Sequence, residues 1–150
     1  HLFLDNELAE GRYEARGRRV ALSDIKVPLY AVGTVRDHVA PWRSVYKAGL
    51  FTDSDITFVL ASGGHNVGIV SEPGREGRGY QAGTRRHGEP YVDPDTWAAQ
   101  VPQHPGSWWP HWQGWLAERS GAPGSVPGMG NAAAGLAPLA PAPGRYVLER

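Results

Sequence analysis

Two short apolar runs separated by a segment of helical periodicity constrain this chain more than any other feature. Residues 25–33 (IKVPLYAVG) and 56–61 (ITFVLA) are rich in β-branched and aromatic residues. Such runs are typical of strands buried on both faces, as in a parallel sheet. Between them, apolar residues recur at helical spacing from Trp42 to Leu50, after Pro41 in the first turn. The pattern predicts a strand–helix–strand unit, and therefore an α/β fold of parallel strands with flanking helices.

The parts on either side of this unit carry weaker signals. Residues 12–21 predict a short hairpin, and the Gly- and Arg-rich residues 71–90 predict a long loop. Asp93-Pro94 is typical of a helix start. Tryptophans at helical spacing predict a Trp-rich helix over residues 108–116.

The end of the chain differs in composition from the rest. The sequence holds 20 Gly and 13 Pro, and residues 121–150 are especially rich in Ala, Gly and Pro. This composition cannot build a core, so we expect an extended low-complexity tail there. The predicted domain is therefore residues 1–120.

Charge and cysteine content exclude several functional classes. With 15 Lys and Arg against 15 Asp and Glu, the formal charge is zero, which argues against nucleic acid as a partner. The chain has no Cys, so it contains no disulfide and no thiol nucleophile. The six His lack the spacings of a metal site, and no metal is expected. No apolar run approaches the roughly 20 residues of a transmembrane helix, and the start does not have the pattern of a signal peptide.

An aspartate and a histidine follow the two predicted strands. Asp37 comes after the first strand, and His65 lies in the Gly-rich segment Ser62–Gly68 after the second. Ligands and catalytic groups of open α/β sheets gather at the carboxyl ends of parallel strands. An Asp that orients a His is the arrangement that activates a nucleophile. The alternative is structural: Asp37 caps the following helix and His65 fills a loop.

Two further residues are candidates for lining the same cleft. His38 directly follows Asp37, and Trp42 begins the predicted helix. For His38 we favour a position on the surface or behind the residues that line the cleft.

A cluster of tryptophans offers a different interpretation. Five of the six Trp lie between residues 97 and 115. Such a cluster is able to form a stacking platform for sugars or single-stranded nucleic acid. Trp at helical spacing is, however, more often part of a core.

Four segments resemble polyhydroxyalkanoate (poly-β-hydroxybutyrate) synthases. Residues 32–42 (VGTVRDHVAPW) resemble the segment that carries the family's catalytic Asp, and residues 62–68 (SGGHNVG) resemble the segment with its catalytic His. Residues 106–112 (GSWWPHW) are similar to an aromatic motif near the family's C-terminus, and residues 142–147 (APGRYV) to the end of the class I enzymes.

The resemblance implies the C-terminal part of an α/β-hydrolase fold and a Cys-Asp-His triad. His65 is then the base that activates the Cys, and Asp37 either orients His65 or activates a 3-hydroxyl group. The nucleophilic Cys is absent from this chain, so we expect it upstream of His1, in a missing N-terminal part of the same enzyme. We expect the fragment alone to be inactive.

The activity implied by the resemblance is that of an acyltransferase. Family members polymerise 3-hydroxyacyl-CoA into a polyester and release coenzyme A, which is part of the substrate, so no cofactor is expected. The resemblance also implies a homodimer, a cytoplasmic location and association with the surface of polyester granules. Two alternatives stay open: a depolymerase or esterase on the same fold, and a non-catalytic aromatic binding module.

Overall fold

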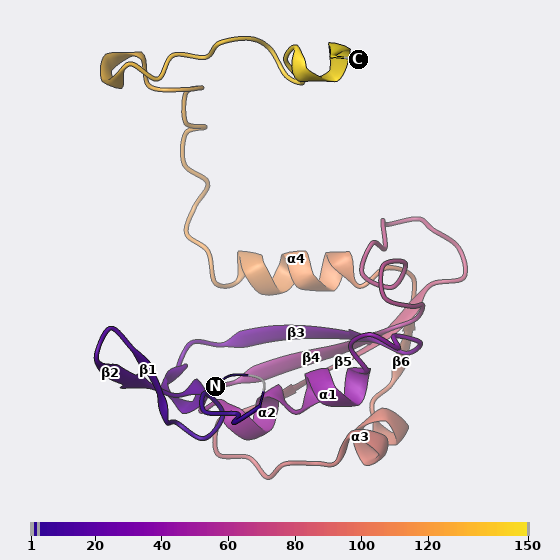
Figure 1. The fold of residues 1–150 in the computed structure, drawn as a ribbon. Coiled ribbons are helices and arrows are strands. Elements are labelled where there is room, and N and C mark those ends of the chain that lie inside the picture. The colour runs from indigo at the N-terminus through magenta and orange to yellow at the C-terminus, as the bar shows by residue number, and fades with distance from the viewer. Residues whose placement is uncertain (1, 3, 150) are drawn as a thin grey trace. The chain divides into compact units, whose positions relative to one another are not determined.

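The computed structural model describes residues 2 and 4–149, which fall into two compact units (Figure 1). One unit extends to Glu118 and the other begins at Arg119. The first contains the hairpin of β1 (Tyr13–Ala15) and β2 (Arg18–Val20), which confirms the hairpin expected over residues 12–21.

A four-stranded sheet forms the centre of the first unit. Its strands are β3 (Leu29–Thr34), β4 (Ile56–Ala61), β5 (Gly79–Arg85) and β6 (Gln103–Pro105), in that spatial order. β3 and β4 are parallel, as the strand–helix–strand pattern predicted, and they pair from Leu29 opposite Ile56 to Thr34 opposite Ala61. β4 is buried along its whole length, as its uninterrupted apolar sequence requires.

The sheet is mixed, so the expectation of purely parallel strands was wrong for its second half. β5 runs antiparallel to β4, and β6 antiparallel to β5. β5 also lies within residues 71–90, which we expected to be a loop. An antiparallel return needs no crossover helix, and tertiary contacts fix the strand. Gln81 donates to the carbonyl of Ala98, and the hydroxyls of Thr57 and Thr84 lie 2.8 Å apart.

Helices cover both faces of the sheet (Figure 1). On one face lie α1 (Trp42–Tyr46), α2 (Ala48–Phe51) and α3 (Pro94–Gln100), and on the other lies α4 (Trp109–Ala117). The predicted single helix after Pro41 is divided at Lys47, whose ψ of −12° departs from regular α-helix. Asp93 caps α3 by accepting from the backbone N–H groups of Asp95 and Thr96.

Each face of β4 contributes to its own core cluster. Phe58 and Leu60 pack with Trp42 on the α1 side, whereas Val59 and Ala61 pack with Trp108 on the α4 side. The hydroxyl of Tyr30 on β3 lies 2.8 Å from Nδ1 of His111, which links the sheet to α4.

Short 3₁₀ helices complete the description. The first unit contains η1 (Leu22–Asp24). The second unit contains η2 (Ala132–Ala134) and η3 (Tyr146–Leu148), and nearly all of its described side chains are exposed. No helix in the part of the chain that the structure describes is long and apolar enough to cross a bilayer.

Truncation of Phe58 tests the core on the α1 side. Phe58 is 3% exposed, and its ring makes edge contacts with Tyr46 and Trp97. Because Phe58→Ala leaves a cavity, we expect the free energy of unfolding to fall by about 3–5 kcal/mol in urea denaturation followed by circular dichroism. Phe51→Ala is the matched control, since Phe51 is 37% exposed and should cost clearly less. Equal losses would contradict this core.

Candidate functional site

The loops after β3 and β4 continue the pairing of the two strands. The backbone N–H of Val35 donates to Ala61, and the N–H of Arg36 donates to the carbonyl of Gly63 at 2.9 Å. These bonds hold the two loops side by side beyond the ends of the strands. Asp37 follows directly in one loop and His65 in the other.

The structure brings the side chains of Asp37 and His65 into contact. Nδ1 of His65 lies 2.9 Å from Oδ2 of Asp37. The Asp37 side chain is only 8% exposed, whereas that of His65 is 49% exposed. Among the described residues, Nε2 of His65 has no hydrogen-bond partner, so this nitrogen is available to a group from outside.

Asp37 also organises its own loop. Its Oδ1 accepts from the backbone N–H groups of Val39 and Ala40, both at 2.9 Å. The carboxylate therefore closes a turn before the helix and contacts His65 at the same time. The structural and the functional interpretations of Asp37 are thus compatible, although α1 itself begins only at Trp42.

Hydrogen bonds keep Asp37 ionised. The N–H of Ala40, with smaller contributions from His65 and Val39, holds the pKa of Asp37 below its usual value against the opposing effect of burial. A carboxylate with a lowered pKa is a permanent negative charge at neutral pH. It favours the tautomer of His65 in which Nδ1 carries the proton and Nε2 is an acceptor.

Two glycines permit the close approach of the His65 segment. Gly63 has a φ of +108°, and a Cβ there would lie 2.9 Å from Gly68. A Cβ on Gly68 would lie 2.5 Å from Cγ2 of Thr34, which is almost fully buried at the end of β3. The segment therefore packs directly on β3.

The other predicted lining residues lie in different surroundings. His38 is exposed in the loop after β3. Trp42 is 7% exposed and packs in the core with Phe58, and the guanidinium of Arg43 lies over its ring.

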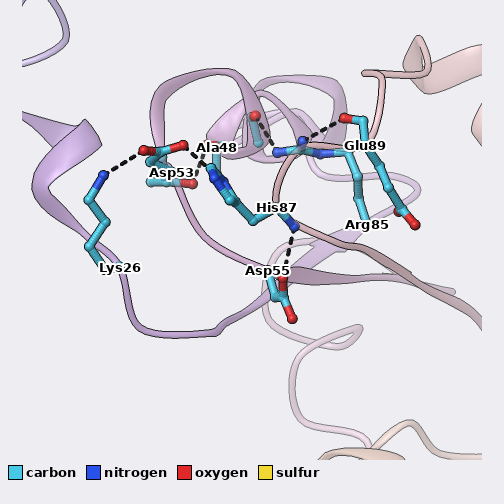
Figure 2. A network of polar contacts seen from close by, with 9 residues as sticks. Lys26, Ala48, Asp53, Asp55, Arg85, His87 and Glu89 are labelled. Atoms are coloured by element: carbon cyan, nitrogen blue, oxygen red, sulfur yellow. Dashed lines mark hydrogen bonds and ion pairs between the residues drawn. The ribbon is translucent and has the colours of Figure 1, made fainter.

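A second Asp–His pair, which sequence reasoning missed, lies at the opposite end of the sheet. Figure 2 shows Asp53 between Lys26 and His87. The Asp53 carboxylate lies 2.5 Å from the Lys26 ammonium and 2.9 Å from Nδ1 of His87. The backbone N–H of His87 donates to Asp55. These residues precede β4 and follow β5, where no catalytic group is expected in a parallel unit.

The fold and the site define an α/β protein with an Asp–His pair beyond the carboxyl ends of two parallel strands. No family model matches the chain. It is 38% identical to poly(3-hydroxyalkanoate) polymerase subunit PhaC of Rhizobium meliloti, over 99% of the chain and 23% of that protein. It is 38% identical to poly(3-hydroxyalkanoate) polymerase of Methylorubrum extorquens, over 97% of the chain and 23% of the relative. It is 36% identical to poly(3-hydroxyalkanoate) polymerase subunit PhaC of Cupriavidus necator, over 98% of the chain and 24% of that protein.

Over nearly its whole length, the chain is similar to part of several poly(3-hydroxyalkanoate) polymerases. This similarity agrees with the resemblance seen in the four motifs. The chain spans about a quarter of the length of these relatives.

The pKa of Asp37 is open to direct measurement. In a ¹³C NMR titration of the 150-residue chain, we expect Asp37 to titrate below the roughly 3.9 of free aspartate. In His65→Ala the pKa should rise but stay below this value, because the Ala40 N–H remains. The stability that Asp37 contributes is therefore present above the ordinary Asp range and lost as pH falls through its lowered pKa. An ordinary or raised pKa in the parent chain would contradict the hydrogen bonding described.

Proposed function

We propose that this chain is the part of a polyester-forming acyltransferase that supplies the base, His65, and its orienting carboxylate, Asp37. The observation that carries the proposal is the 2.9 Å hydrogen bond between His65 Nδ1 and Asp37, together with homology to named polymerases over nearly the whole chain. The parallel β3–β4 unit with α1 and α2 between its strands supports an α/β-hydrolase fold for the complete enzyme.

In the proposed reaction Nε2 of His65 first accepts a proton and later gives it up. It accepts the proton of a Cys thiol from another part of the enzyme, and the thiolate attacks the thioester carbonyl of a 3-hydroxyacyl-CoA. The bond from the carbonyl carbon to the sulfur of coenzyme A then breaks. The leaving thiolate takes the proton from the imidazolium, and the acyl group stays on the Cys.

The hydrogen bonding of Asp37 supports an orienting role. Oδ2 contacts His65, and Oδ1 already accepts from two backbone N–H groups. A carboxylate held in this way stabilises the imidazolium that forms during the reaction. Oδ2 keeps a second lone pair, so activation of the 3-hydroxyl by Asp37 stays open as the alternative role.

The wider properties of the family are part of the same proposal. We expect the complete enzyme to act on 3-hydroxyacyl-CoA and its growing polyester, as a homodimer at cytoplasmic granules. The aromatic binding module gains no support, because Trp97, Trp108 and Trp109 pack against the two core clusters. A hydrolase on the same fold would release free hydroxyacid in place of polymer, so analysis of the product separates these two activities.

Replacement of His65 is the first test. In the full-length enzyme we expect His65→Ala to slow release of coenzyme A from 3-hydroxybutyryl-CoA by about 10²–10⁴-fold, because the general base is lost. His87→Ala is the matched control: His87 also bonds an Asp at 2.9 Å, but at the opposite end of the sheet. Its turnover should stay near that of the parent enzyme. Near-normal turnover in His65→Ala would overturn the assignment.

Replacement of Asp37 tests the orienting carboxylate. Asp37→Asn keeps an oxygen for the backbone N–H groups but loses the charge that faces His65. We expect turnover in the same assay to fall, though less than in His65→Ala, because the base itself remains. Asp53→Asn changes the carboxylate of the second pair and should have little effect. Equal turnover of Asp37→Asn and the parent enzyme would remove Asp37 from the mechanism.

A further inference from the structure

The His65 segment, residues 63–71, forms a turn that must be held in place by hydrogen bonds at both of its ends. The N–H of Gly68 donates to Gly64 at 2.9 Å, and the N–H of Val70 donates to Asn66 at 2.9 Å. Its upstream end is tied to the loop after β3 through Gly63 and Arg36. Its downstream carbonyls, which a turn of this kind leaves without internal donors, need partners from elsewhere.

Three consecutive side chains before and at the start of α4 supply those partners. The indole Nε1–H of Trp108 donates to the carbonyl of Gly68, and that of Trp109 donates to the carbonyl of Ile69, both at 3.0 Å. The hydroxyl of Ser107 donates to the carbonyl of Ser71. It also accepts the backbone N–H of Trp109, which fixes its own orientation.

The donors are themselves held rigidly. Trp108 is 6% exposed and packs against Val59 and Ala61 on β4, the strand that leads to His65. The N–H of Gly106 donates to the carbonyl of Arg78 at 2.8 Å. The buried Ser107 and Trp108, together with the partly buried Trp109, therefore anchor the downstream end of the His65 segment.

We propose that Ser107, Trp108 and Trp109 are positioning residues for His65, which they hold against Asp37 through the carbonyls of the His65 segment. They do not touch the reacting atoms and act through the backbone. The inference rests on the proposed function, since it assigns a role in orienting its base.

Removal of the indole donors tests the inference in the full-length enzyme. Trp108→Phe and Trp109→Phe keep an aromatic ring and lose the N–H. Trp112→Phe is the matched control: it makes the same change in α4, and Trp112 contacts the Trp108 ring without an indole hydrogen bond in the described structure. The kcat and KM for release of coenzyme A are measured against pH, with the thermal midpoint recorded for each variant.

We expect kcat to fall about tenfold to a hundredfold in Trp108→Phe and Trp109→Phe, with KM little changed, because a small misplacement of the base is costly. The kcat–pH profile should also differ from that of Trp112→Phe, because His65 no longer faces the Asp37 carboxylate in the same geometry. A merely structural role would lower the thermal midpoint and leave the pH profile of the folded enzyme unchanged.

The outcomes separate this inference from the proposed function. If both variants keep the kcat and pH profile of Trp112→Phe while His65→Ala is inactive, the positioning role is overturned and the proposed function stands. If His65→Ala is active, the proposed function itself fails. Should Trp108→Phe not fold, Trp109→Phe decides, because its ring is only partly buried and contributes less to the core.

Discussion

The parallel pairing of β3 with β4 is the constraint on which the candidate site depends. Thr34 lies opposite Ala61 at the end of the ladder, and the bonding continues to Arg36 and Gly63. A slip of two residues in this register would shift one loop by about 6–7 Å relative to the other. The hydrogen bond between Asp37 and His65 would not survive such a shift. The burial of β4 on both faces specifies this pairing register.

The packing of α1 on β3 explains the place of Trp42. A Cβ on Gly33 would lie 2.9 Å from the Cβ of Trp42, so only glycine lets the helix approach this closely. Trp42 fills the space against Phe58. Its aromatic ring thus packs on β4, the strand that leads to His65, which is a structural contribution to the site.

The sequence was informative where local composition decided the structure. The run over residues 56–61 and the cap at Asp93 matched the observed elements, and the positions of Asp37 and His65 followed from strand ends. β5 escaped prediction because glycines and an arginine hide its character, and long-range contacts stabilise it. The bonds from Trp108 and Trp109 were equally hidden, since no spacing indicates an indole that donates to a carbonyl 40 positions away.

The two Asp–His pairs show why residue type and distance do not by themselves define a site. Asp53 is 47% exposed and shares its charge between Lys26 and His87, so solvent weakens each interaction. Asp37 is shielded, fixed by two backbone N–H groups, and has one side-chain partner. A fixed charge in a shielded position needs little reorganisation when an imidazolium forms beside it. The shielding and the backbone hydrogen bonds of Asp37, which depend on the turn at Ala40 and the β3–β4 register, therefore distinguish the pair that we propose for catalysis.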